Sequence, residues 1–126
     1  MPNLHGSTEG TLRGFKRGIE ETRIARERGQ IRDPRSFISL DGHSILYGVD
    51  KTRRREEIYA RAQGRCEGCP SRHYVPWEVG EWHHIRGGLT GRCDCLGNAL
   101  WTCGDFHRAQ HVQVRLGERE AEGHVR

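Results

Sequence analysis

The residues that could bind a metal or move a proton are concentrated in the second half of this 126-residue chain. Cys66 and Cys69 enclose two residues, and that spacing lets a tight turn direct both sulfurs to one metal ion. The second enclosed residue is Gly68, which permits such a turn. Cys103 supplies a third thiolate further along the chain. This pattern predicts a structural zinc site.

The fourth ligand of that zinc site has two candidates. Structural zinc is almost always held by four protein ligands, and Cys93 and Cys95 both lie within reach in the sequence. Residues two apart on an extended chain point to the same side, so the spacing does not choose between them. We favour Cys95, because it is closer to the strand that leads to Cys103, and keep Cys93 as the alternative.

Two adjacent histidines, His83 and His84, fall within residues 81–85, a short apolar-rich run that predicts a β-strand. Neighbouring side chains on a strand point to opposite faces, so one histidine can bind a metal while the other faces a different group. Residues 98–102 predict the returning strand. The helix predicted over residues 105–116 carries two histidines one turn apart on one face, His107 and His111.

The N-terminal residues 1–36 are expected to form a basic, partly flexible arm. Leu12, Phe15 and Ile19 would lie on one side of a short helix in this arm. Pro34 would break the chain after the helix. The arm is expected to lead directly into the folded domain.

A hairpin is predicted next, because residues 37–40 and 43–47 are short apolar runs on either side of Asp41-Gly42. His43 flanks this turn, and we interpret it as a turn residue and not as a metal ligand.

Residues 52–63 predict a helix that Asp50 or Thr52 could cap. Arg53 and Arg54 stand at its start, where cations oppose the helix dipole. Their placement is therefore not explained by helix stability, and both are candidates for contacting phosphate groups.

Composition favours a nucleic-acid partner and a metal-stapled fold. The formal net charge is +4, and only 33% of the residues are hydrophobic. The mean hydropathy is −0.85, so the core should be small and should require a bound metal or another cross-link for stability. We find no apolar run that could span a membrane and no apolar signal-peptide core. A cytoplasmic location is expected, in which the five cysteines would be reduced and would bind metal more readily than form disulfides.

Taken together, the order Cys-x2-Cys, His-His, Asn, Cys, His, His resembles the HNH endonuclease family, in particular its zinc-containing phage-type members. The resemblance covers roughly residues 46–116 and rests mainly on three segments, 82–85, 98–103 and 107–111. It implies an α+β fold with a ββα-metal core and a zinc knuckle, preceded by a helical and hairpin segment. The nuclease domain would span residues 37–116, followed by a tail over residues 117–126.

The resemblance also assigns roles to single residues. His84 would take a proton from water, and Asn98 would orient the loop that positions it. His83 and His107 would bind a catalytic divalent ion, with His111 as a third ligand. We expect Mg²⁺ or Mn²⁺ there, with Ni²⁺ or Zn²⁺ as alternatives.

The implied activity is hydrolysis of DNA phosphodiester bonds. One small site that contacts phosphates predicts nicking with low sequence specificity. Arg86 and Arg108 flank the predicted site and join Arg53 and Arg54 as candidate DNA contacts. The expected setting is a phage-encoded monomer or weak dimer in the host cytoplasm, with phage packaging proteins as candidate partners.

One position departs from the family pattern, since the second cysteine of the usual second pair would stand at Phe106. A four-ligand zinc site would then need Cys95 or Cys93 as a substitute.

The alternative function is a non-catalytic, zinc-stabilised DNA-binding module on the same scaffold. The intact set of His83, His84, Asn98 and His107 favours the enzyme, because a pure binding module would not require all four.

Overall fold

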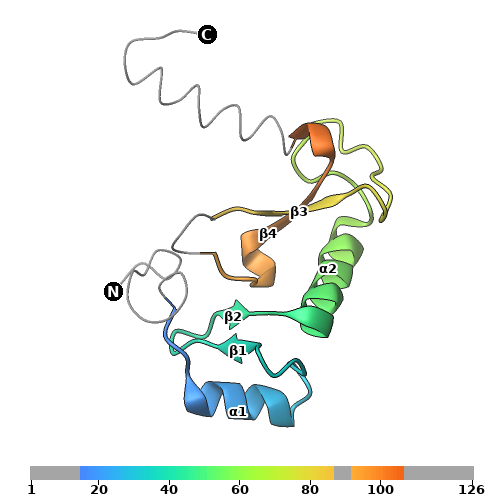
Figure 1. Ribbon diagram of the computed structural model, residues 1–126. Coiled ribbons are helices and arrows are strands. Elements are labelled where there is room, and N and C mark those ends of the chain that lie inside the picture. The colour runs from blue at the N-terminus through green and yellow to red at the C-terminus, as the bar shows by residue number, and fades with distance from the viewer. Residues whose placement is uncertain (1–14, 87–91, 107–126) are drawn as a thin grey trace, which may run out of the picture.

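Two small antiparallel hairpins and two α-helices form the described part of the chain (Figure 1). The structure is a computed structural model and describes residues 15–86 and 92–106. Its elements, in chain order, are α1 (Ile19–Glu27), β1 (Phe37–Ile38), β2 (Ser44–Ile45), α2 (Gly48–Ala62), β3 (Glu81–His84), the 3-10 helix η1 (Leu96–Asn98) and β4 (Ala99–Thr102). The predicted α+β class is confirmed. None of the helices in the described ranges is long and apolar enough to cross a membrane.

The β1–β2 hairpin forms where the two apolar runs were expected to pair. Phe37 lies opposite Ile45, and the turn contains Gly42, whose φ of 88° is in the left-handed region that glycine adopts without strain. α1 packs against this hairpin through Thr22, whose hydroxyl donates to the Ile38 carbonyl at 3.2 Å. The same hydroxyl accepts the Ile38 N–H at 3.0 Å. The predicted hairpin is therefore confirmed.

Phe15 lies before α1 and is buried beside the hairpin, at 2% exposure. Ile19, the first residue of α1, is 81% exposed. The expected apolar stripe is therefore wrong, because the helix begins after Phe15; Leu12, its other member, lies outside the described residues. The buried face of α1 is formed by Thr22 and Ala25.

Asp50 ties the segment before the hairpin to α2. Its carboxylate accepts the Arg32 N–H and the Asp33 N–H, both at 2.8 Å. α2 begins at Gly48, and its N-cap residue, Tyr47, makes no side-chain capping bond, so the predicted caps Asp50 and Thr52, which lie inside the helix, do not have that role. Residues 15–36 therefore pack as part of the fold, although we expected them in an arm spanning residues 1–36. Residues 1–14 are outside the described ranges.

The second hairpin, β3–β4, packs against α2 and contributes Ala99 and Trp101 to the larger core. His84 lies opposite Ala99, which confirms the strands predicted over residues 81–85 and 98–102 to within about a residue at their ends. Trp101 on β4 is fully buried, and its indole N–H donates to the Val75 carbonyl at 3.1 Å. The chain is again helical at residues 104–106, and the rest of the helix predicted over 105–116 lies beyond the described residues. The core around Trp101 contains Ile58, Ala62, Cys66, Val75, Ala99 and Cys103.

The two hairpins meet at Asp94, in the connection between β3 and β4. Its backbone N–H donates to the Ser44 carbonyl at 2.7 Å, and its carboxylate accepts the Leu46 N–H at 2.7 Å. Arg54 of α2 donates to the Asp94 carbonyl at 3.0 Å. The Asp94 end of this connection therefore lies beside β2, between the two hairpins.

We expect Asp50→Ala to lower the free energy of unfolding by about 1–3 kcal/mol, because two backbone N–H groups lose a charged acceptor. Urea unfolding followed by circular dichroism at pH 7 measures the change. Glu56→Ala, at an exposed position of the same helix, is the control and should change stability by less than about 0.5 kcal/mol.

The same variant should show a pH dependence. Burial alone would raise the pKa of Asp50, but hydrogen bonds from Ser36 and from the backbone of Asp33 and Arg32 outweigh it and hold the pKa below its ordinary 3.8. The carboxylate therefore stabilises the fold above that ordinary value and loses its contribution as the pH falls through the lower folded value. Wild type and Asp50→Ala should converge in acid; equal stability at pH 7 would contradict the role given to Asp50.

Candidate metal centres and the His84 site

Three of the predicted zinc ligands come together in the larger core. Cys66 follows α2, Cys69 lies in the next turn, and Cys103 follows β4; their sulfurs are all within 4.8 Å of one another. Cys69 Sγ and Cys103 Sγ are 3.6 Å apart. Two sulfurs on one tetrahedral zinc ion, each at a Zn–S distance of about 2.3 Å, are about 3.8 Å apart. This group could therefore hold a metal ion such as zinc.

Backbone N–H groups point at these sulfurs. Cys66 Sγ accepts from the Cys69 N–H at 3.3 Å and from the Cys103 N–H at 3.4 Å. Burial would raise the pKa of Cys66, but these bonds and one from Gly68 outweigh it and lower that pKa. The hydrogen bond with Cys103 raises the pKa of Cys69 to about 12. The turn thus favours the thiolate form at Cys66, the form that binds metal.

An aromatic ring packs against the turn of Cys66 and Cys69, from the position where the resemblance would place a cysteine. Phe106 covers the knuckle so closely that a Cβ atom on Gly68 would lie 2.5 Å from its ring. The expected fourth ligand, Cys95, and its alternative, Cys93, belong to a different group, which corrects that prediction. The physical reason is distance: Cys95 precedes β4 and Cys103 follows it, and a four-residue strand spans roughly 13 Å.

The second group consists of His43, Cys93 and Cys95, whose ligand atoms also lie within 4.8 Å of one another. Cys95 Sγ is 3.4 Å from His43 Nδ1. The interpretation of His43 as only a turn residue is thus incomplete. The sequence carried a hint in the Cys-x-Cys pattern, but the 52 residues between His43 and Cys95 concealed their proximity.

Thiolate formation in this second group is favoured at one sulfur. The hydrogen bond from Cys93 lowers the pKa of Cys95 to about 5, although burial acts in the opposite direction. Hydrogen bonds from the Ser44 N–H and from His43 lower it further. The pKa of Cys93 is raised, first by the hydrogen bond with Cys95 and then by burial.

His84 is held in one orientation by two neighbours. Its Nε2 lies 2.9 Å from Asp94 Oδ1, and both side chains are at least nine-tenths buried. The Trp82 indole stacks on the imidazole, with ring centroids 5.1 Å apart and an interplanar angle of 18°. A carboxylate bonded to one imidazole nitrogen fixes the tautomer and the ring position. Sequence reasoning missed Asp94, which has no local pattern that links it to His84.

His83 faces the other way, as expected for adjacent residues on a strand. Its ring meets the edge of Phe106, with centroids 5.8 Å apart and an interplanar angle of 85°. His83 thus faces the point where the chain becomes helical again. The predicted site residues His107, Arg108 and His111 lie outside the described residues.

Asn98 fastens both sides of the connection between β3 and β4. Its Oδ1 accepts the Arg86 N–H at 2.9 Å. Its Nδ2 donates to the Arg86 carbonyl at 3.2 Å and to the Cys93 carbonyl at 3.0 Å. Asn98 is 3% exposed and its bond to Cys93 is buried, whereas its bonds to Arg86 are partly buried. The residue therefore fixes the chain on both flanks of the connection.

Two arginines predicted to bind DNA are engaged within the fold. Both terminal nitrogens of Arg53 donate to the Gly29 carbonyl at 3.1 Å. Arg54 bonds the Asp94 carbonyl and pairs with Glu57 at 2.9 Å. Because α2 begins at Gly48 and not at residue 52, the two arginines lie in its second turn and not at its start, and their bonds to the Gly29 and Asp94 carbonyls account for their positions.

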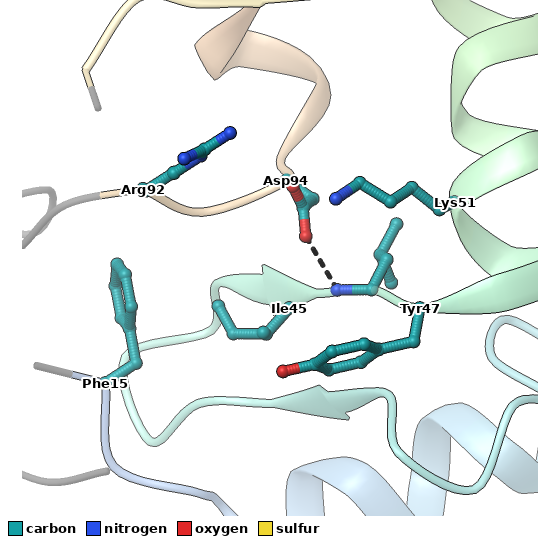
Figure 2. A pocket seen from close by; sticks show the side chains of 7 residues that line it. Phe15, Ile45, Tyr47, Lys51, Arg92 and Asp94 are labelled. Atoms are coloured by element: carbon teal, nitrogen blue, oxygen red, sulfur yellow. Dashed lines mark hydrogen bonds between the residues drawn. The ribbon is translucent and has the colours of Figure 1, made fainter. Parts of the chain in front are cut away.

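Other cations line a pocket of about 320 Å³ beside Asp94. Figure 2 shows the Lys51 side chain extending toward Asp94 from α2, and Arg92 extending over the pocket from the connection that carries Asp94. Phe15 and Tyr47 are among its apolar walls. Lys51 and Arg92 are thus placed to meet an anion near the His84–Asp94 pair.

Comparison with protein-family models, curated proteins and solved structures finds no match for this chain.

We expect Phe106→Cys to increase zinc affinity by roughly tenfold or more, because it adds a fourth thiolate beside Cys66, Cys69 and Cys103. Competition with a chromogenic chelator measures the affinity. Phe106→Ala removes the ring without adding a donor and is the control. If both variants bind zinc equally well, position 106 does not face the metal.

Proposed function

We propose that the chain is an HNH-type, metal-dependent endonuclease that hydrolyses phosphodiester bonds in DNA. The observation that carries the proposal is His84, a largely buried histidine whose side chain is 10% exposed, held by Asp94 and Trp82 on the β3–β4 hairpin beside a cation-lined pocket. The hairpin is followed by helical residues 104–106, the order of elements that the family resemblance implies. A neutral imidazole oriented by a carboxylate is suited to general-base work near neutral pH.

The His84–Asp94 pair defines which nitrogen would act. Asp94 Oδ1 faces Nε2, so the neutral imidazole donates its Nε2 proton to Asp94 and uses Nδ1 as the base. Nδ1 takes a proton from water, and the resulting hydroxide attacks phosphorus. The bond from phosphorus to the leaving oxygen breaks, and that oxygen then takes up a proton. Asp94 stabilises the imidazolium that forms on His84.

The catalytic ion proposed by resemblance would be held on the other face of β3, by His83 with His107 and His111. Imidazole nitrogen is a good ligand for Ni²⁺ and Zn²⁺, and Mg²⁺ or Mn²⁺ would need oxygen from substrate and water. Such an ion supplies Lewis-acid stabilisation of the phosphate and of the leaving oxygen.

Asn98 is a positioning residue in this proposal. It holds the carbonyl of Cys93, the residue before Asp94, and therefore acts on His84 through the backbone of its carboxylate partner. Misplacement of a base by about 1 Å can cost about a hundredfold in rate, so this fixation has catalytic value.

Lys51 and Arg92 are proposed to bind the DNA backbone in place of Arg53 and Arg54. They line the pocket beside Asp94, and a net charge of +4 favours a polyanion. A single site of this kind cuts one strand at a time, so nicking is the proposed outcome for a monomer.

The test is a supercoiled-plasmid assay at low salt, without metal and with Mg²⁺, Mn²⁺ or Ni²⁺. We expect metal-dependent nicked circles, and His84→Ala should reduce nicking by at least roughly a hundredfold while DNA affinity persists. His73→Ala is the matched control, because His73 is exposed and bonds only Ser71 among the described contacts of its ring. If His84→Ala cuts the plasmid as fast as wild type, the assignment of His84 as the general base is wrong. Tight DNA binding without cutting under any metal would favour the non-catalytic binding module.

A second prediction concerns the pocket. Lys51→Gln should weaken DNA binding and reduce the salt dependence of the affinity by about one counterion, since one phosphate contact is lost. Fluorescence anisotropy with a labelled duplex at several salt concentrations measures both. Lys16→Gln is the control, because Lys16 is the chain's other lysine and does not line the pocket. Equal losses in the two variants would show only a general charge effect.

A further inference from the structure

We propose that His43, Cys93 and Cys95 form a second structural zinc site, which fastens the β1–β2 turn to the connection between β3 and β4. The site is separate from the Cys66–Cys69–Cys103 group and does not depend on the proposed nuclease activity. Its ligands come from two segments that are far apart in the sequence.

The spacing of the donor atoms fits one tetrahedral ion. A nitrogen and a sulfur bound to the same zinc, at about 2.0 and 2.3 Å, are roughly 3.5 Å apart. Cys95 Sγ and His43 Nδ1 are 3.4 Å apart, and Cys93 Sγ lies within 4.8 Å of both ligand atoms. The three donors therefore lie close enough together to share one ion.

The chemistry of the donor set selects zinc over hard cations. Two thiolates and one imidazole suit Zn²⁺, whereas Mg²⁺ and Ca²⁺ require oxygen ligands. The nearby carboxylate, Asp94, already bonds His84 and the Leu46 N–H. The Ser44 N–H donates to Cys95 Sγ at 3.3 Å, as expected around a metal-bound thiolate. On loading, the two cysteine thiols would release their protons to solvent.

The surroundings are those of a structural site. Cys93 is 0% and His43 6% exposed. The Phe15 ring packs 5.3 Å from the His43 ring, and Phe37 and Ile45 complete the apolar shell. An apolar, closed shell limits access of competing ligands to the metal and is typical of a structural ion.

The fold around these residues needs such a staple. β1 and β2 are two residues long each, and a hairpin this short is marginal without further support. Among the described residues, the core beside it contains four buried hydrophobic residues, and one of them is Cys93 itself. A bound ion would add the cross-link that this small core lacks.

The experiment measures zinc per chain in the full-length protein, reloaded with excess zinc under reducing conditions and desalted. His43→Phe keeps the ring beside Phe15 but removes the donor, and should carry one zinc fewer than wild type. His43→Cys restores a donor and should match wild type. Cys66→Ser should lose one zinc from the other site, and the double variant His43→Phe/Cys66→Ser should lose two.

The comparison between variants separates a ligand from a merely structural residue. Equal zinc in His43→Phe and wild type would overturn the proposal. So would loss of a single shared zinc in His43→Phe, Cys66→Ser and the double variant, because that would indicate one site. Failure of His43→Cys to recover the zinc lost in His43→Phe would also contradict a ligand role. Circular dichroism of each variant shows whether a loss follows from unfolding. Plasmid nicking has no part in the readout, so failure of the nuclease proposal leaves this test intact.

Discussion

The carboxylate of Asp94 is the group on which the arrangement of the two hairpins depends. One oxygen meets His84 Nε2 on β3, and the other accepts the Leu46 N–H just after β2. The backbone of the same residue bonds Ser44 and Arg54. A buried carboxylate is tolerated only when its hydrogen-bonding capacity is used, and here that need joins β3 to the residue after β2. The backbone carbonyl of Asp94 adds α2 through Arg54. The orientation of the proposed catalytic base and the packing of the two halves are therefore set by the same contacts.

Strand β3 links the two clusters of candidate metal ligands, Cys66–Cys69–Cys103 and His43–Cys93–Cys95. At one end, His84 is held through Asp94, which stands between Cys93 and Cys95. At the other end, Glu81 pairs with Thr102, the residue before Cys103. Each end of β3 is thus connected to a group that could hold a metal ion. Short strands around a small core would be stabilised by such cross-links more than by burial of apolar side chains.

The features that the sequence predicted correctly are those that depend on residues close together in the chain. The spacing of Cys66 and Cys69 and the strand of His84 are examples, since each depends on neighbours a few residues away. The failures concern distant partners. Asp94 meets Leu46 across 48 residues, and His43 meets Cys95 across 52, and no periodicity reports such a pairing. Both involve polar groups whose partners are chosen by how the two hairpins pack, and the sequence pattern describes each hairpin separately.

The segments that carry the two clusters of candidate metal ligands overlap along the chain, and this overlap affects the free energy of metal binding once each cluster holds an ion. One group closes a loop of 52 residues from His43 to Cys95, and the other closes a loop of 34 residues from Cys69 to Cys103. Each closure removes chain entropy worth on the order of 4 kcal/mol from the unfolded ensemble. Because the loops interlock instead of lying side by side, closing the loop from Cys69 to Cys103 shortens the path between His43 and Cys95 from 52 residues to about 34. The coupling between two binding events is reciprocal, so it acts in both directions. Occupancy of one ion would therefore lower the entropic cost of binding the second, and the two metals would be coupled through the unfolded chain without touching each other.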